Sequence, residues 1–134
     1  MICLFVSFEV KSKSDDLSGK QLLCRDSTNV YGFSFSNKEV TYYDLDEVII
    51  PGTLYVLRGE YKTNPKKIMF SFSEVEGFFF EIDRQNLTFI IDGNFPEFQK
   101  ELQIKCDIFD GNIGMFIRNL QMKIKKEFKS KQKI

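Results

Sequence analysis

The densest group of side chains capable of chemistry lies in the stretch EVTYYDLDEV, residues 39–48. It contains four carboxylates and two phenols: Glu39, Asp44, Asp46, Glu47, Tyr42 and Tyr43. Clustered carboxylates attract positively charged surfaces and steer association with them, and tyrosine is enriched where proteins contact one another. These six residues are therefore the predicted binding site for a partner.

A plainer interpretation of the same stretch is an exposed, charged loop. In this interpretation Thr41 and Asp44 form a capping box at the start of a helical turn. The plainer interpretation is slightly favoured for each residue taken singly, and the two are level for the cluster as a whole.

The sequence contains few of the side chains that enzymes commonly use for catalysis. The chain contains no histidine, which removes Ser-His-Asp and Cys-His nucleophiles and the imidazole base. An enzyme that uses paired carboxylates is a third hypothesis, and it predicts a buried carboxylate with a raised pKa in a cleft. We predict a protein without enzymatic activity and assign no catalytic residue.

Metal and cofactor motifs are equally sparse. The stretch DIFDGN, residues 107–112, lacks the ligand spacing of a calcium loop and is predicted to be a helix-terminating turn that uses Gly111. The cysteines Cys3, Cys24 and Cys106 are odd in number, lie far apart and form no CxxC pair, so we expect buried, reduced thiols in a cytosolic protein. No metal site and no cofactor is predicted.

Most of the chain before residue 92 has the period-two pattern of β-strands. Apolar residues alternate with polar ones in three successive segments, and they would share one sheet face: Ile68, Phe70, Phe72; Phe78, Phe80, Ile82; Leu87, Phe89, Ile91. Turn signals lie at DRQN, between the last two of these segments, and at STN, between the earlier strands QLLCRD and VYGFSFS. Phe79 and Ile90 break the alternation, and cross-strand pairing could place them together at a covered edge.

The period changes after Gly93. Residues 95–106 have Pro96 in a first turn and apolar residues three and four apart, which predicts a helix. Residues 113–128 carry an apolar stripe opposite several lysines and predict a second, amphipathic helix that covers the phenylalanine face. Residues 129–134 are predicted to be a frayed basic tail.

Together these patterns predict a single α+β domain, residues 1–134. Its antiparallel, mostly meandering sheet would have about six to eight strands within residues 2–92, packed by one or two C-terminal helices, residues 95–106 and 113–128.

Residues 1–98 carry a net charge of −5 and residues 99–134 a net charge of +5. No run reaches the roughly 18 apolar residues that span a bilayer, and residues 1–10 lack the features of a signal peptide. We expect a cytoplasmic protein without stable membrane insertion and without nucleic acid as a partner.

Residues 30–105 resemble the bacterial pleckstrin-homology-like domains. The resemblance rests on the segment VTYYDLDEV after an early strand, on the hairpins that follow, and on FPEFQKELQ as a capping helix. It implies a bent, nearly orthogonal sheet plugged by a helix, and a module that binds lipid headgroups or a peptide.

The chain as a whole is similar in kind to the immunity proteins of contact-dependent inhibition systems. It is short, rich in Phe, Ile and Lys, and acidic over most of its length. The resemblance implies tight binding of a bacterial toxin, such as a basic nuclease, through an acidic and aromatic surface. Our leading prediction is such an inhibitor, and the alternative is the pleckstrin-homology-like module.

Overall fold

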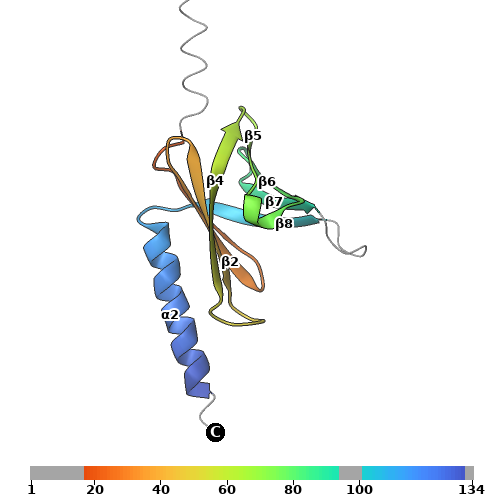
Figure 1. The fold of residues 1–134 in the computed structure, drawn as a ribbon. Helices are drawn as coiled ribbons and strands as arrows, with labels where there is room; N and C mark the ends of the chain where they lie inside the picture. Colours follow the sequence, from red (N-terminus) through yellow and green to blue (C-terminus); the bar gives the residue numbers. More distant parts are fainter. Residues whose placement is uncertain (1–16, 94–100, 132–134) are drawn as a thin grey trace, which may run out of the picture.

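The computed structural model describes residues 17–93 and 101–131. Within these residues eight antiparallel strands form a closed barrel in which each strand pairs with the next and β8 returns to β1. A helix lies outside the barrel (Figure 1). The elements are β1 (Gln21–Arg25), β2 (Asn29–Phe35), β3 (Glu39–Asp46), β4 (Leu54–Thr63), β5 (Lys67–Phe70), the 3-10 turn η1 (Ser73–Val75), β6 (Phe78–Asp83), β7 (Thr88–Gly93), β8 (Glu101–Ile108) and α2 (Ile113–Lys131).

Aspartate side chains set two of the hairpin turns. The Asp26 carboxylate accepts the backbone N–H of Thr28 at 2.9 Å and of Asn29 at 2.7 Å between β1 and β2. Asp83 accepts the backbone N–H of Gln85 at 2.8 Å in the same way between β6 and β7. A carboxylate that satisfies these amides mimics a backbone turn, so both predicted turns, STN and DRQN, are confirmed.

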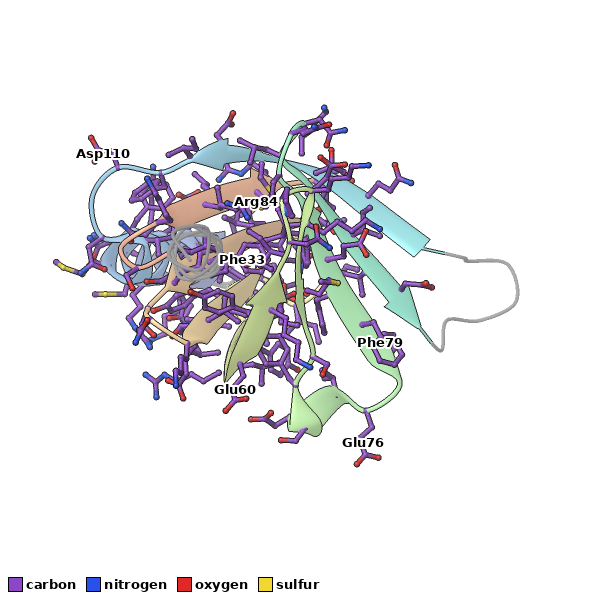
Figure 2. The ribbon with its side chains drawn as sticks, turned by 90° about the horizontal axis from the view of Figure 1, so that it is seen from above. Phe33, Glu60, Glu76, Phe79, Arg84 and Asp110 are labelled. Atoms are coloured by element: carbon purple, nitrogen blue, oxygen red, sulfur yellow. A yellow bond between two sulfur atoms is a disulfide. The ribbon has the colours of Figure 1, made fainter. Side chains whose placement is uncertain are left out.

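Aromatic rings fill the inside of the barrel. The ring centroids of Phe33 and Phe89 lie 4.8 Å apart at an interplanar angle of 75°, an edge-to-face packing that aromatic pairs favour. Figure 2 looks down on the barrel, with Phe33 among the interior side chains. The prediction that alternating residues share an inner face is confirmed for the seven that are buried: Ile68, Phe70, Phe72, Phe80, Ile82, Phe89 and Ile91.

The predicted helix over residues 95–106 is wrong where the structure describes it. Residues 101–108 form the strand β8, which pairs with β7 on one side and with β1 on the other; residues 95–100 lie outside the described residues. Ile104 and Cys106 are buried inside the barrel. Two neighbouring strands satisfy the backbone of β8 with ladder hydrogen bonds, and this outweighs a weak helical pattern.

The second predicted helix is present, but it does not cover the phenylalanine face. Closure of the barrel seals that face, and α2 packs on the outside of the sheet against β1, β2 and β3. Ile113 and Ile117 are buried there with Val30 and Leu45 in a second, smaller core. Gly32 permits this close approach, since a Cβ at position 32 would lie 2.9 Å from Ile113 Cγ1.

The last four residues of DIFDGN, 109–112, form a turn before α2, whereas Asp107 and Ile108 belong to β8. The predicted turn is therefore present in part, but it follows a strand and not a helix. Gly111 has a φ of +123°, a conformation that favours glycine. The Asn112 side chain accepts the backbone N–H of Met115 at 3.0 Å, and Gln21 Oε1 accepts the backbone N–H of Ile113 at 2.7 Å. These bonds satisfy amide groups that the first helical turn leaves unpaired. The helix then continues to Lys131 and so includes the first residues of the predicted tail.

The expectation of reduced thiols is wrong for Cys24 and Cys106. The two residues face each other across β1 and β8 and form a disulfide. They are 82 residues apart in the chain, and only barrel closure brings them together. Disulfides persist in oxidising compartments, so this bond counts against the cytosolic argument that was based on cysteine. Cys3 lies outside the described residues.

The α+β class and the antiparallel meander are confirmed, with barrel closure as the more specific result. In the part of the chain that the structure describes, no helix has both the length and the apolar character needed to cross a bilayer.

Candidate functional site

The predicted binding cluster lies mainly on a strand rather than in a loop. Glu39 to Asp46 form β3 in the middle of the β2–β3–β4 sheet. The proposed capping box of Thr41 and Asp44 is therefore wrong, because both residues adopt strand conformation. Alternation along β3 sends neighbouring side chains to opposite faces, so the six residues cannot form one surface.

Tyr42 points into the barrel and is 4% exposed. Its ring centroid lies 5.3 Å from that of Phe33 and 5.5 Å from that of Phe80. Its hydroxyl donates to Asp44 at 3.2 Å, which satisfies the one polar atom of the side chain. Burial, followed by the nearby Asp44 carboxylate, raises the pKa of Tyr42 well above its ordinary value, so the phenol stays a hydrogen-bond donor at neutral pH.

Asp44 is half-buried at the end of the barrel interior. It accepts a hydrogen bond from Asn29 Nδ2 at 2.7 Å in addition to that from Tyr42. Burial raises the pKa of Asp44 although both hydrogen bonds act to lower it. A second pair lies beside it, in which the Tyr31 hydroxyl donates to Asp26 at 3.2 Å. These two carboxylates give the buried phenols their partners, so their observed role is structural.

The paired-carboxylate enzyme hypothesis asked for a buried carboxylate with a raised pKa in a cleft. Asp44 supplies the carboxylate, but it lines neither of the two surface hollows described below.

Tyr43 points outward and is covered by α2. Its hydroxyl oxygen would lie 2.7 Å from a Cβ added at Gly114 in the first turn of the helix. It packs against the outer core rather than standing free for a partner.

The remaining three predicted residues lie near the surface at opposite ends of β3, Glu39 at one end and the adjacent Asp46 and Glu47 at the other. Glu39 is exposed at the start of β3. Asp46, at the other end of β3, accepts the backbone N–H groups of Val48 and Ile49, both at 2.9 Å. Glu47 forms an ion pair with Arg25 at 3.5 Å. The cluster that is compact in sequence is therefore dispersed in space.

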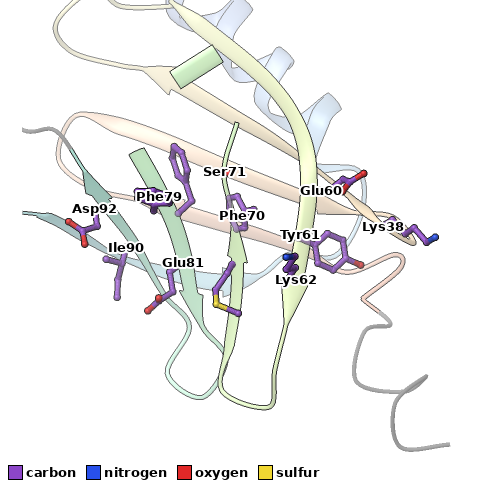
Figure 3. A pocket seen from close by; sticks show the side chains of 12 residues that line it. Lys38, Glu60, Tyr61, Lys62, Phe70, Ser71, Phe79, Glu81, Ile90 and Asp92 are labelled. Atoms are coloured by element: carbon purple, nitrogen blue, oxygen red, sulfur yellow. The ribbon is translucent and has the colours of Figure 1, made fainter. Parts of the chain in front are cut away.

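A surface hollow lies away from the β3 cluster, across β4, β5, β6 and β7, and has a volume of about 880 Å³. We call it the Phe79 hollow (Figure 3). Its apolar lining includes Met69, Phe79 and Ile90. Phe79 is 67% exposed, and Figure 2 shows it directed away from the barrel interior. Large exposed aromatic side chains in a hollow are typical of binding surfaces.

The register explains why the two residues that break the alternation meet here. Phe79 is opposite Asp92, and Ile90 is opposite Glu81, across β6 and β7. Phe79 and Ile90 are therefore diagonal neighbours on the outer face, within reach of each other. They lie on the wall of a closed barrel and not at a sheet edge. The broken alternation was the sequence signal for this site.

Charged residues of both signs surround the apolar centre of the Phe79 hollow. The acidic members are Glu60, Glu81 and Asp92, and the basic members are Lys38 and Lys62. Glu81 is also paired with Lys67 at 3.2 Å, which offsets part of the negative charge. With Lys67 included, three acidic and three basic side chains surround the hollow, so it has an apolar centre and a polar rim of balanced charge. This is the usual anatomy of a protein-binding patch.

Among the described residues no group of three or more Cys, Asp or Glu side chains is placed to hold a metal ion. The comparisons with known proteins add no family: no protein-family model matches the chain, and no curated protein and no solved structure matches it.

Proposed function

We propose that this protein binds another protein, without catalysis, through the Phe79 hollow. The observation that carries the proposal is the 67% exposure of Phe79 at a hollow of about 880 Å³ that also contains Met69 and Ile90. Burial of such a side chain in an interface favours binding by about 1.5–3 kcal/mol. This is comparable to the binding free energy that is lost when a hot-spot residue is truncated.

The filled interior of the barrel favours an outer site over an inner one. Eight-stranded barrels are just wide enough to be filled by side chains or to hold one small ligand. Here the buried aromatic side chains of β2, β3, β5, β6 and β7 occupy the interior. A partner therefore has the outer surface available, where strand-borne side chains form a rigid platform.

The leading candidate for the partner is a basic protein domain, such as a bacterial toxin that this protein would neutralise. The net charge of −5 over residues 1–98 supports a positively charged partner. The Phe79 hollow replaces the binding site predicted from the sequence, because β3 directs several of the predicted side chains inward or under α2. The predicted residues were Glu39, Tyr42, Tyr43, Asp44, Asp46 and Glu47. The pleckstrin-homology-like alternative, with a lipid headgroup or a peptide as ligand, stays a prediction.

Site-specific photo-crosslinking tests the proposal in cells that naturally make the protein. A photoreactive phenylalanine analogue replaces Phe79 in one protein and the exposed Tyr55 of β4 in a control. We expect a discrete crosslinked partner from position 79 and none from position 55. The same crosslinks from both positions, or from neither, would argue against the hollow as a binding site.

The captured partner can then be measured directly with purified proteins. We expect Phe79→Ala to weaken its binding at least about tenfold, as for a central hot spot. For a basic partner the association rate should fall as salt is added, because screening removes electrostatic steering. An unchanged affinity for the Phe79→Ala variant would contradict the proposal.

A further inference from the structure

A second apolar surface lies at the loop between β3 and β4, away from the Phe79 hollow. Three consecutive aliphatic residues at this loop are exposed: Val48 by 56%, Ile49 by 73% and Ile50 by 65%. Single exposed apolar side chains are ordinary, but a contiguous group of them marks a contact surface.

The loop is held in a shape that presents these side chains to solvent. The Asp46 carboxylate accepts the backbone N–H of Val48 and Ile49, both at 2.9 Å, and of Ile50 at 3.0 Å. The backbone N–H of Gly52 donates to Asp46 O at 2.8 Å and closes the loop. With its backbone ordered in this way, the loop loses little further entropy on binding.

The C-terminal half of α2 lies beside this loop (Figure 1). Gln121 Nε2 donates to Gly52 O at 3.0 Å, and the methylene groups of Lys125 lie against Gly52. A hollow of about 320 Å³ separates Pro51 from the helix, and Phe128, 42% exposed, lines it. We call residues 47–52 and 120–131 together the loop–helix end.

The charge of the loop–helix end is positive. Helix α2 carries six basic residues and one acidic residue, Glu127: the basic ones are Arg118, Lys123, Lys125, Lys126, Lys129 and Lys131. The acidic groups of the loop are already engaged, since Asp46 accepts three backbone N–H groups and Glu47 pairs with Arg25 at 3.5 Å. Aliphatic residues at a tip beside lysines are the combination that binds an anionic lipid surface.

We propose that the loop–helix end docks on the surface of an anionic membrane. Ile49 and Ile50 enter the boundary between headgroups and acyl chains, and the α2 lysines contact the lipid phosphates. The long lysine side chains can cover apolar surface while their ammonium groups reach the headgroups. Contact with a second copy is disfavoured, because a symmetric contact would bring two basic helices together.

Vesicle sedimentation with the full chain tests this proposal. The probes are vesicles of phosphatidylcholine alone and vesicles in which about a third of the lipid is phosphatidylserine, a fraction that gives a strongly negative surface. We expect binding to the anionic vesicles that weakens as salt is added, and little binding to the neutral ones. No binding to anionic vesicles at low salt would overturn the proposal.

Variants separate the aliphatic and the electrostatic contributions. We expect the double variant Ile49→Ser with Ile50→Ser to weaken vesicle binding at least about tenfold, because it removes the inserted apolar surface. We expect the triple variant Lys125→Gln, Lys126→Gln, Lys129→Gln to weaken vesicle binding at least about tenfold as well. Each lysine contributes at most about fivefold to the binding constant. The matched controls are Phe79→Ser and Lys62→Gln on the β4–β7 face, which should leave vesicle binding unchanged.

Two other outcomes would also overturn the proposal. One is vesicle binding that persists fully in the Ile49→Ser, Ile50→Ser variant. The other is loop-dependent self-association, or loop-dependent capture of a protein, in the absence of vesicle binding. Circular dichroism should show all variants to be folded, since every altered side chain lies on the outer surface. Because Phe79→Ser alters the proposed protein-binding hollow and not the loop–helix end, the vesicle assay tests membrane docking separately from the proposed protein-binding function.

Discussion

Cys24 on β1 and Cys106 on β8 face each other across the seam of the barrel and are joined by a disulfide. The seam is where the first and last strands of the described barrel meet, so the bond links the two ends of the meander. Both cysteines are buried among the aromatic side chains of the interior. The disulfide therefore constrains the one strand pairing that depends on contacts far apart in the sequence.

Reduction of this disulfide should destabilise the protein by about 4.5 kcal/mol. The estimate follows from the chain entropy that a crosslink removes from the unfolded state over a separation of 82 residues. Urea unfolding of the oxidised and the fully reduced protein measures the difference, with Cys3→Ser in both samples so that no other thiol can react.

Alkylation followed by mass spectrometry provides the control. In the oxidised protein neither Cys24 nor Cys106 should react with iodoacetamide before a reductant is added. Equal unfolding free energies with and without reductant would show that the seam does not depend on the crosslink.

Substitution of Asp44 by asparagine should change the dependence of stability on pH. Burial raises the pKa of Asp44 in the folded protein, so protonated Asp44 favours the fold at low pH. That stability is lost as the pH rises through the raised folded pKa, because the fold must then hold a charged carboxylate. The amide that replaces the carboxyl group does not ionise. The stability of Asp44→Asn relative to the wild type should therefore increase from about pH 4 towards neutral pH.

Asp83 is the matched control because its pKa is shifted in the opposite direction. Backbone N–H groups of Asn86 and Gln85 lower the pKa of this carboxyl. The stability that Asp83 contributes is present above the ordinary carboxyl pKa and is lost as the pH falls, so Asp83→Asn should show the opposite slope. Urea midpoints measured across the pH range decide both cases, and parallel curves for Asp44→Asn and the wild type would contradict the first.

Gly32→Ala should destabilise the protein by about 1–3 kcal/mol, the usual effect of overpacking. The added Cβ would lie 2.9 Å from Ile113 Cγ1 and would also clash with Ile117 Cδ1. Combining it with Ile117→Val removes that Cδ1 atom. The double variant should then lose less stability than the sum of the two single variants. Strict additivity in a chemical-denaturation cycle would show that α2 is not docked on Gly32.

Phe79→Ala and Phe80→Ala should differ sharply in their effects, although the residues are adjacent. Phe80 is 5% exposed inside the barrel and Phe79 is 67% exposed outside it. We expect Phe80→Ala to cost about 3–5 kcal/mol and Phe79→Ala to change stability by less than about 0.5 kcal/mol. Thermal and urea unfolding measure both. A large loss from Phe79→Ala would mean that its ring supports the fold rather than a binding surface.

The strands of this protein could be predicted from its sequence because alternation is a local property. Ile68, Phe70 and Phe72 alternate with polar neighbours, and the same rule identified Phe79 and Ile90 as residues that do not fit. The candidate binding cluster on β3 could not be predicted in the same way. Tyr42 and Tyr43 are adjacent in sequence but lie on opposite faces of a strand, so their proximity in the chain does not give them a common surface.

The helix predicted over residues 95–106 is wrong over residues 101–106, because the apolar residues there fit both a helical and a strand period. Leu102 and Cys106 are four apart, as on one face of a helix, and with Ile104 between them they also alternate as in a strand. Only the pairing of β8 with β7 and β1 distinguishes the two patterns.

By itself the sequence determined the local conformations: the inward rows of aromatic residues, the turns at Asp26 and Asp83, and the amphipathic helix that begins at Ile113. The tertiary structure alone decided barrel closure, the disulfide between Cys24 and Cys106, and the face on which α2 lies. The physical reason is that alternation reports which side of a strand is apolar. An open sheet covered by a helix and a barrel closed on itself bury the same rows, and only long-range pairing selects between them.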